Sequence, residues 1–411
     1  MKILLVNKFF YPKGGAEIAM LEQARLLQKN GHQVAFFSMH HRQNQYSDHD
    51  KFFVSHIDLS QPAYSPKGIK TIGRMIYSFE AKKKFKKMLN DFKPDIVHYH
   101  NIYHQISPSI LGVAKKMGIP TVMTLHDYKI ICPNYLLFSR TAVCERCKVY
   151  KYYQPILQKC FKNSRIAGMI IAIESAIHRI MKIYEKNIDI FISPSKFTKE
   201  KINSWRPDIG KRIKVLAHFI DTKRFPISQN LGDYIISYGR LEMVKGFDVL
   251  LRVMKQLPDI KIKIIGSGSD EEQIKQLAKD MRNVEFIPHL GWTNLIKELQ
   301  GARLILNLSK FYETFGLTVL EAMALGKVMI ATEGGAMEEL IDNGKTGVQV
   351  GVGNVDDVKN AIQSLYNNEN KLLEMGQAAR EKVENIYGEE SYYLKLMDIY
   401  NSLLNDGGEM G

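Results

Sequence analysis

The chain has 411 residues, of which 45% are hydrophobic and 24% are charged, values typical of a soluble globular protein with room for two domains. Its sequence shows no apolar run long enough to span a membrane and no signal-peptide core at the start, so we expect a cytoplasmic protein. Residues 1–220 carry 36 Lys and Arg against 15 Asp and Glu, a net charge of +21, whereas the remainder carries 21 against 28, or −7. This asymmetry indicates that the first half meets an anionic surface.

The first half alternates strand-like apolar runs with helical patterns. We expect strands at residues 3–6, 32–37, 96–98, 121–125 and 188–192, and helices at 16–29, 79–91, 107–117 and 165–184. This alternation is typical of a parallel sheet with helices on both faces. Residues 166–183 are the most hydrophobic stretch of the chain, and we interpret them as a buried helix, with a membrane-dipped or acceptor-lining helix as alternatives.

Small and polar residues follow two of these strands. Open α/β sheets bind their ligands at the carboxyl ends of the strands, so these positions are candidate sites. Gly14 and Gly15 lie between the first strand and the first helix, where absent side chains let backbone N–H groups approach a pyrophosphate. His126 and Asp127 directly follow the strand at 121–125, a position that favours a functional imidazole.

A second histidine group lies just past the strand at 96–98, in the sequence H-Y-H-N-I-Y-H. It contains His98, His100 and His104. We interpret these side chains as lining the acceptor side of an active site, although a polar loop explains the same spacing.

All four cysteines of the chain lie in one segment, and C-E-R-C forms its centre. They are Cys132, Cys144, Cys147 and Cys160. The spacing resembles a structural zinc site of four thiolates, and free or redox-active thiols are the alternative. A reducing cytoplasm disfavours disulfides between them.

The helix expected at 79–91 is strongly basic. Its lysines, set among aromatic and aliphatic residues at helical spacing, are Lys82, Lys83, Lys84, Lys86 and Lys87. A basic amphipathic helix suits an anionic membrane face, with about 1 kcal/mol per Lys near the surface. A solvated helix face that covers the sheet is the simpler alternative. Nucleic acid is disfavoured, because no helix-turn-helix, zinc-finger or RNP-like pattern accompanies the charge.

The second half begins after a polar stretch at 222–233, which we interpret as the linker between two domains. Strands are expected at 234–238, 260–265, 284–287 and 302–308. Arg240 and Lys245 bracket the loop after the first of these and provide a guanidinium fork and a point charge suited to a diphosphate. The G-S-G-S-D-E loop after 260–265 lacks the third glycine of a dinucleotide fingerprint.

Two carboxylates stand eight positions apart after the strand at 302–308. Glu313 is expected in a loop and Glu321 on a helix that begins near Gly316. The first N–H groups of that helix have no intrahelical partner and lie at the positive end of its dipole, so they form an anion site.

These motifs occur in an order that resembles the family 4 retaining glycosyltransferases, over nearly the full chain. The matching elements are the Gly14–Glu17 turn, the His126–Asp127 step, the Arg240 and Lys245 pair, and the E-x7-E segment from Glu313 to Glu321. The resemblance implies the α/β GT-B fold, in which two Rossmann-like domains face each other across a cleft and a C-terminal helix crosses back to the first. We expect an acceptor domain at 1–221 with the Cys-containing insertion at 132–160, a nucleotide-sugar domain at 222–388, and the crossover helix in 389–411.

The resemblance also implies a hexosyltransferase that moves a sugar from a nucleoside-diphosphate sugar to a hydroxyl, with retention at the anomeric carbon. His126 would contact the donor sugar, Glu313 its hydroxyls, and Glu321 the ribose. Arg240 and Lys245 would bind the diphosphate, with Gly14 and Gly15 also on the donor. The remaining donor contacts expected are Pro288, Phe315, Gly316 and Leu317.

No catalytic metal is expected, because cations and a helix terminus take that role. D-H-D at 48–50 resembles the Asp-x-Asp of another glycosyltransferase class but lies in a polar loop. We expect a glycan or lipid-linked acceptor in cell-surface polysaccharide synthesis and a peripheral position on the cytoplasmic membrane face. The alternatives are a nucleotide-sugar epimerase on the same fold and a non-catalytic basic protein that binds nucleic acid.

Overall fold

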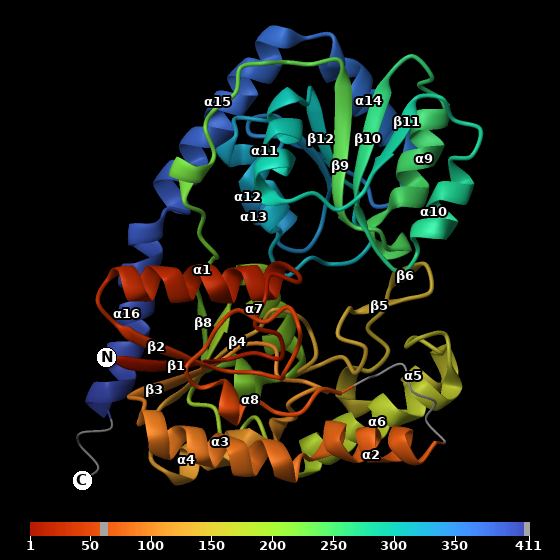
Figure 1. Ribbon diagram of the computed structural model, residues 1–411. Helices are drawn as coiled ribbons and strands as arrows, with labels where there is room; N and C mark the ends of the chain where they lie inside the picture. Colours follow the sequence, from red (N-terminus) through yellow and green to blue (C-terminus); the bar gives the residue numbers. More distant parts are fainter. Residues whose placement is uncertain (58–64, 407–411) are drawn as a thin grey trace. The chain divides into compact units, whose positions relative to one another are not determined.

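The computed structural model describes residues 1–57 and 65–406 and divides into two units (Figure 1). The first unit comprises residues 1–140, 144–217 and the C-terminal segment from Tyr392; the second comprises 141–143 and 218–391. The last residues of the predicted C-terminal segment, 407–411, lie outside the described part of the chain. Within that part, no helix is both long and apolar enough to cross a bilayer.

The first unit is built on a parallel six-stranded sheet with the order β2-β1-β3-β4-β7-β8. Its strands are β1 Lys2–Val6, β2 Gln33–Phe37, β3 Ile96–Tyr99, β4 Thr121–Thr124, β7 Ile190–Ser193 and β8 Ile213–Val215. An isolated parallel bridge joins Met39 to Val54 beyond β2. Most strand residues are buried on both sides, as parallel sheets covered by helices require.

The helices of this unit cover both faces of its sheet (Figure 1). They are α1 Gly15–Lys29, α2 Pro66–Ile76, α3 Phe79–Phe92, α4 Leu111–Lys116, α5 Gln154–Gln158, α6 Arg165–Ile180, α7 Lys196–Trp205 and α8 Pro207–Gly210, followed at the C-terminus by α16 Glu389–Asp406. A two-stranded hairpin pairs β5 Phe138–Ser139 with β6 Ala142–Val143. On α16, Leu396 and Tyr400 are completely buried, and the Tyr400 hydroxyl lies 2.7 Å from Nδ1 of His98.

The second unit repeats the design with the strand order β11-β10-β9-β12-β13-β14. Its strands are β9 Tyr234–Arg240, β10 Lys261–Ser267, β11 Val284–Ile287, β12 Leu304–Asn307, β13 Met329–Thr332 and β14 Val348–Val350. Its helices are α9 Phe247–Lys255, α10 Glu271–Leu277, α11 Trp292–Gly301, α12 Leu317–Ala324, α13 Met337–Leu340, α14 Val355–Tyr366 and α15 Glu369–Ile386. The order reverses between β9 and β12, so loops leave that point in opposite directions and make room for a ligand.

The predicted strands are confirmed to within two residues at each end, while β8, β13 and β14 had not been predicted. The helix expected at 107–117 is a 3-10 turn, Pro108–Ile110, followed by α4, because Pro108 begins the helical segment. The interpretation of 166–183 as a buried helix is wrong for half of its surface. Ile171 and Ala172 of α6 are buried, but Ile166 and Ile173 are exposed.

Candidate functional site

The loops at the switch point of the second sheet are held together by backbone and ionic contacts. Gly246, with a φ of +79°, lies against the end of β12, where an added Cβ would be 1.9 Å from the carbonyl oxygen of Leu308. Only glycine allows this approach. The backbone N–H of Lys310 donates to the carbonyl of Val244 at 2.8 Å, and the Lys310 ammonium pairs with Asp248 at 3.0 Å. The loop after β9 is thereby fixed beside the loop after β12.

This arrangement brings together two of the residues predicted from the sequence. The Lys245 ammonium lies 2.5 Å from Oε1 of Glu313, and the Ser309 hydroxyl donates to the same oxygen at 2.7 Å. Burial acts to raise the pKa of Glu313, but the charge and hydrogen bond of Lys245 outweigh it and hold that pKa below its ordinary value. Glu313 is therefore a carboxylate at neutral pH and holds the Lys245 side chain in one place.

The second predicted carboxylate lies on α12. Burial raises the pKa of Glu321 to about 7, although the Tyr238 hydroxyl, which donates to Oε2 at 2.6 Å, opposes that rise. Tyr238 also donates to the backbone carbonyl of Thr318 at 3.1 Å, which fixes it between β9 and α12. Glu321 is thus a carboxyl poised to change its charge near neutral pH.

Helix α12 begins without a side-chain cap. Its N-cap is Gly316, with a φ of +128°, and an added Cβ there would meet the Met337 methyl group at 2.5 Å. The first N–H groups of the helix have no intrahelical acceptor and lie at the positive end of its dipole. Phe315, just before the cap, is buried against His218 with ring centroids 5.1 Å apart.

The remaining predicted donor residues of this unit are more exposed. The Arg240 side chain is 59% exposed and donates to Oε1 of its neighbour Glu242 at 2.8 Å. Pro288 lies in the exposed loop between β11 and α11. Leu317 is the first residue of α12. With Lys245 and the α12 terminus, Arg240 makes the carboxyl edge of this sheet a place where an anion is stabilised.

At the first sheet, Gly14 is the N-cap of α1 and has extended backbone, with Gly15 as the first helical residue. The side-chain NH2 group of Asn7 donates to Glu17 at 3.1 Å. The side-chain oxygen Oδ1 of Asn7 accepts from the backbone N–H of Asn101 at 2.9 Å. These contacts join the loop after β1 to the loop after β3. The glycine turn therefore lies at the switch point of its own sheet.

Three histidine rings form a stack beside that turn. The ring centroids of His98 and His100 are 4.6 Å apart, and those of His100 and His126 are 5.1 Å apart. Nδ1 of His100 lies 2.8 Å from Nε2 of His126, so one ring donates its proton to the other. His98 is completely buried between Tyr400 and Thr124, and burial, with the charge of His126, lowers its pKa to about 3. Within the stack, His126 is the half-buried ring.

His104 lies apart from this stack. Its Nδ1 is 3.2 Å from Glu174 of α6, whose other oxygen is 2.7 Å from the Lys129 ammonium. All three side chains are buried, and we call them the buried ion cluster. The charges of Lys129 and His104 outweigh burial and hold the pKa of Glu174 well below its ordinary value. His98 and His104, both expected on an acceptor surface, are thus packed inside the first unit.

Comparison with known proteins identifies the architecture. Residues 13–224, more than half of the chain, match the family model described as Glycosyltransferase Family 4, and residues 220–382 match Glycosyl transferases group 1. The chain belongs to glycosyltransferase family 4. A protein from the cps region of Klebsiella pneumoniae, described as uncharacterized, is 29% identical over 367 residues, 83% of this chain and 87% of that protein.

Two solved structures support the same assignment of the fold. HepE from Anabaena, solved with UDP and glucose, has a TM-score of 0.69 at 15% identity and covers 98% of this chain and 100% of HepE. Sucrose-phosphate synthase from Thermosynechococcus elongatus has a TM-score of 0.73 at 18% identity and covers 99% and 100%. This glycosyltransferase therefore has the GT-B fold, and its two parallel sheets are the Rossmann-like halves of that fold.

Several residues of this glycosyltransferase that hold the candidate site were not predicted from its sequence. Tyr238 and Ser309 each bind one of the predicted carboxylates, and both lie at or just past a strand end. That position is the signal that could have found them. Glu174 could have been found because it is an acidic residue within the apolar run I-A-I-E-S-A-I. A carboxylate buried in such a run requires a buried partner.

The four-cysteine zinc site considered from the sequence stays a prediction. Among residues 1–57 and 65–406, no group of three or more His, Cys, Asp or Glu side chains is arranged to hold a metal ion. The Cys132 thiol instead donates to Oδ1 of Asn134 at 2.9 Å. Burial, followed by the neighbouring cysteines, raises the pKa of Cys132 to about 12 and that of Cys160 to about 11. A zinc ion bound at this segment would have to displace the protons of these thiols.

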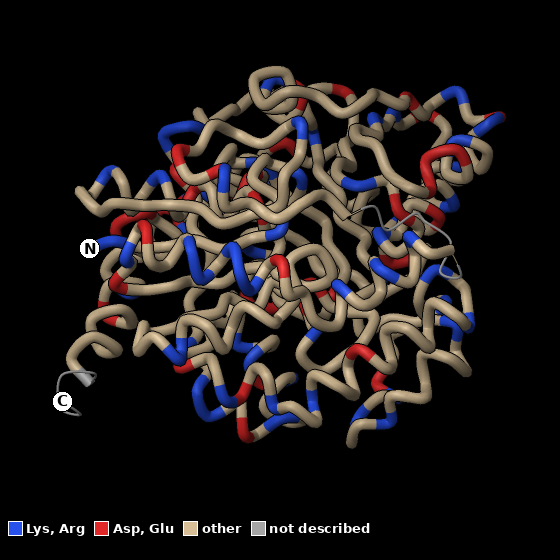
Figure 2. Tube along the Cα trace, turned by 60° about the horizontal axis from the view of Figure 1, so that its bottom comes forward, with Lys and Arg blue, Asp and Glu red and all other residues tan. Residues whose placement is uncertain are grey.

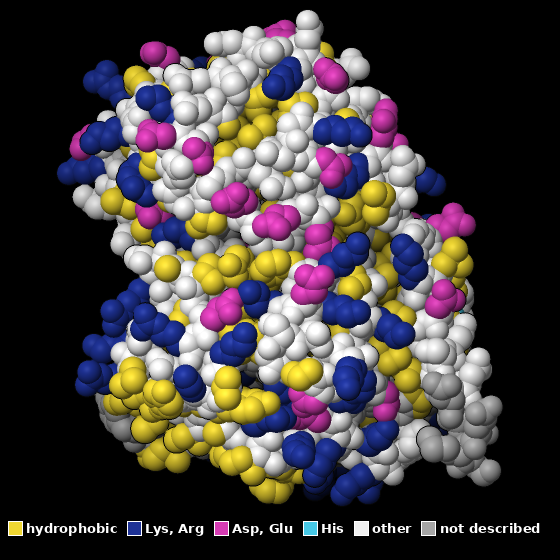
Figure 3. Space-filling view, turned by 180° about the vertical axis from the view of Figure 1, so that it is seen from behind, with side chains coloured by type: hydrophobic (Ala, Val, Ile, Leu, Met, Phe, Trp, Pro, Cys, Tyr) yellow, Lys and Arg dark blue, Asp and Glu magenta, His cyan; other side chains and the backbone are white. Residues whose placement is uncertain are grey.

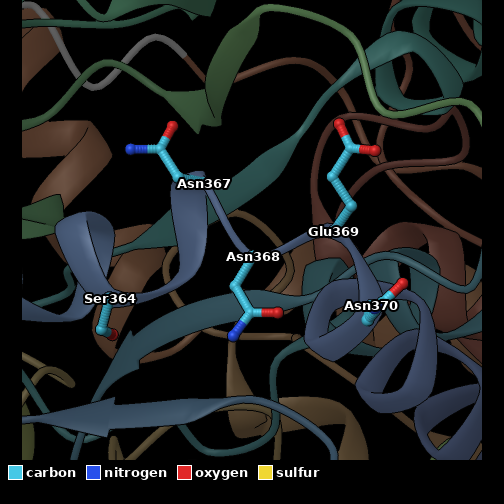
Figure 4. Close-up of a pocket in the computed structure, with 5 residues that line it drawn as sticks. All are labelled: Ser364, Asn367, Asn368, Glu369 and Asn370. Atoms are coloured by element: carbon cyan, nitrogen blue, oxygen red, sulfur yellow. The ribbon is translucent and has the colours of Figure 1, made fainter.

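An open polar depression lies at the other end of the second sheet (Figure 4). It is lined by Ser364, Asn367, Asn368, Glu369 and Asn370, where α14 gives way to α15. Glu369 pairs at 2.9 Å with Arg303, which directly precedes β12. The depression therefore lies at the amino ends of the strands, away from the switch point.

Proposed function

We propose that this protein transfers a hexose from a nucleoside-diphosphate sugar to a hydroxyl of a glycan or lipid-linked acceptor, with retention at the anomeric carbon. The observation that carries this proposal is the Lys245–Glu313 pair, held by Ser309 beside the uncapped start of α12. A cation, a fixed carboxylate and free helix amides at one switch point suit a sugar diphosphate. HepE, which shares the fold, was solved with UDP and glucose.

In this proposal the second unit binds the donor. Arg240, Lys245 and the first N–H groups of α12 bind the two phosphates, where negative charge grows as the sugar leaves. Glu321 accepts hydrogen bonds from the ribose hydroxyls. Glu313 binds hydroxyls of the sugar while it positions Lys245. The loop at Pro288 packs on the base, and Phe315 supports the start of α12.

The reaction breaks the bond between the anomeric carbon and the diphosphate oxygen. The acceptor oxygen forms its new bond on the face that the diphosphate leaves, and the acceptor proton passes to the departing diphosphate. His126 of the first unit binds a hydroxyl of the donor sugar, with Gly14 and Gly15 near the diphosphate. The three histidines first considered for the acceptor surface, His98, His100 and His104, are all buried. Of the three, His100 contacts the half-buried His126, and the acceptor in this proposal lies near that ring.

The excess of positive charge in the first half supports an acceptor carried on the cytoplasmic face of an anionic membrane. A sugar-nucleotide epimerase would need no such surface. A nucleic-acid-binding protein would need no ordered Lys245–Glu313 pair.

A thermal-shift experiment with UDP, GDP and ADP, without added metal, tests the donor site. One of the three should raise the melting temperature of the wild type, since a ligand that binds only the folded state stabilises it. Glu321→Ala should reduce that rise. Glu272→Ala, an exposed carboxylate of α10 in the same unit, should leave it unchanged. No response of the wild type to any nucleotide would contradict the assignment.

A further inference from the structure

The exposed face of α6 is an extended apolar feature of the first unit that packing among the described residues does not explain. Its outward side chains recur at helical spacing and are Ile166, Met169, Ile173 and Ile180, with Ile180 81% exposed. The opposite face holds Glu174 and His178 inside the unit. A helix that is apolar on both faces usually covers its second face with a partner.

Neighbouring elements extend this face. Both α5 and α2 pack against α6. They contribute the exposed side chains of Leu157 and Ile69, and Tyr153, at the start of α5, is also exposed. Figure 3, seen from behind, shows apolar side chains gathered at its lower left. This corresponds to the lower right of Figure 1, where α2, α5 and α6 lie. We call these outward residues of α2, α5 and α6 the apolar face.

The charges around the apolar face are positive. Helices α2 and α5 contain no acidic residue, and the single one of α6, Glu174, is buried against Lys129. The exposed cations on or beside these helices are Lys67, Lys70, Lys159, Arg165 and Lys182. Figure 2 shows how Lys and Arg predominate over Asp and Glu along this side of the first unit.

The basic helix singled out in the sequence does not provide such a surface. Phe85, Met88 and Leu89 of α3 are buried in the core, so its apolar face already covers the sheet. Its exposed lysines, Lys83 and Lys87 among them, can add attraction at long range. Phe79, at the start of α3, is the one large apolar side chain of this helix that is exposed, so α3 has no apolar stripe to insert.

We propose that the apolar face docks this glycosyltransferase onto an anionic phospholipid bilayer. The apolar side chains enter the headgroup boundary, and the surrounding Lys and Arg contact lipid phosphates. The combination of an aliphatic stripe with surrounding cations favours a bilayer over a nucleic acid. A nucleic acid would be attracted by the cations but would not bury the aliphatic side chains. The inference rests on the proposed function only for its purpose, access to a lipid-linked acceptor.

Vesicle flotation of the full chain tests the surface. The wild type should float with vesicles of phosphatidylcholine and phosphatidylglycerol and remain behind with phosphatidylcholine alone. Ile173→Glu, in the middle of the stripe, should lower the partition coefficient by at least about tenfold, because it removes an inserted side chain and adds a like charge to the lipid. Leu373→Glu, an exposed apolar position on α15, is the matched control and should float as the wild type does.

A triple variant separates the two basic surfaces. Lys83→Gln, Lys86→Gln and Lys87→Gln on α3 together should lower flotation less than Ile173→Glu alone. The proposal is overturned if the wild type does not float, if Ile173→Glu floats normally, or if the wild type sediments as a dimer that Ile173→Glu makes monomeric. In the last case a second copy covers the face.

The docking test and the donor test can fail independently. Flotation is measured without nucleotide, and nucleotide-induced stabilisation is measured without vesicles. Ile173→Glu should keep the full thermal response to the nucleotide that stabilises the wild type, which also shows that the variant is folded. Loss of flotation with an intact thermal response to nucleotide supports the docking surface. Loss of both flotation and thermal response indicates that Ile173→Glu is misfolded. In that case Met169→Glu must lose flotation while keeping the thermal response for the proposal to stand.

Discussion

Two lysine–carboxylate pairs occupy comparable places in the two units and have opposite surroundings. Lys129 follows β4 and lies 2.7 Å from Glu174, with side chains only 3% and 0% exposed. Lys245 follows β9 and lies 2.5 Å from Glu313, with side chains 22% and 14% exposed. The chemistry of the pair is the same, so exposure decides what each can do.

The buried pair is nearly closed to solvent and has further partners within the unit, because Glu174 also contacts His104 and Lys129 also donates to the carbonyl of Pro133. It fixes α6 against the loop after β4. The more exposed pair keeps N–H groups of its lysine turned to solvent at a switch point, where an anion can reach them. The comparison supports a structural role for the first pair and is consistent with the binding role proposed for the second.

The largest expected effect is on stability, from Glu174→Gln. The change leaves the Lys129 charge buried without its partner and should cost about 3–5 kcal/mol of unfolding free energy in the first unit. The chain has two tryptophans, and Trp292→Phe leaves Trp205 of α7 as a fluorescent reporter of the first unit. Urea unfolding in that background measures the loss.

Two comparisons control this prediction. Glu200→Gln, an exposed carboxylate of α7, should change stability little, and Lys129→Met combined with Glu174→Gln should recover part of the loss. Because the folded-state pKa of Glu174 lies below its ordinary value, the wild type gains stability above that ordinary value and loses it as pH falls through the folded pKa. The variant should lack this part of the acid dependence. Equal unfolding free energies of the wild type and Glu174→Gln would contradict the structural role of the Lys129–Glu174 pair.

The next effect is on catalysis, from Lys245→Met. Removing a cation from the place where the diphosphate develops charge should slow release of the nucleotide from its sugar by about 100- to 1,000-fold. Lys261→Met, at an exposed lysine paired with Asp233 at 2.7 Å where β10 begins, is the matched control. A normal rate in Lys245→Met would mean that Lys245 only holds Glu313 in place.

The sequence was sufficient for most of the strands and for Lys245 and Glu313, which the fold brings together at one switch point, because both depend on local pattern. Apolar runs marked most strands, and Lys245, Glu313 and Glu321 were identified by their spacing after strand ends. The contacts among them could not be predicted, since the Ser309 bond to Glu313 and the Tyr238 bond to Glu321 depend on how separate loops approach.

The histidine group shows that residues close in sequence can lie apart in the fold. His98, His100 and His104 were treated as one set because they lie close in sequence. The alternation of a strand turns His98 and His100 to one side, while His104 lies beyond the strand in a loop with a φ of +63° and reaches Glu174 instead. For α6, the high hydrophobicity of the segment was evident from the sequence, but nothing in it indicated that one apolar face would remain uncovered.

A smaller effect is expected for Tyr238→Phe, which tests how the Tyr238 hydroxyl acts on Glu321 in the second unit. Loss of the hydroxyl removes the bond that opposes burial, so the pKa of Glu321 should rise further above about 7. In the proposed role, the carboxylate form of Glu321 binds the ribose, so we expect nucleotide affinity at neutral pH to fall by about tenfold. Affinity should recover as pH rises, with a midpoint higher than in the wild type.

The pH dependence separates this role from simple packing. In the unliganded wild type, the raised pKa of Glu321 means that stability declines as pH increases through about 7, and bound nucleotide should offset that decline. Titration calorimetry from below to above neutral pH measures both proteins. Glu321→Gln should bind weakly with no such dependence, and a Tyr238→Phe profile identical to the wild type would show that the hydroxyl does not act through Glu321.

The smallest effect is expected within the histidine stack of the first unit. His100→Phe preserves a ring between His98 and His126 but removes the 2.8 Å hydrogen bond to His126. If His100 positions His126 on the donor sugar, kcat should fall by about fivefold while nucleotide affinity stays unchanged. Tyr400→Phe removes one of the hydrogen bonds to buried His98 and should lower stability without changing kcat. The two variants thus distinguish a half of the stack that orients a reacting sugar from a half that only packs. Equal effects of both variants on kcat would contradict that distinction, as would a loss of nucleotide affinity in His100→Phe.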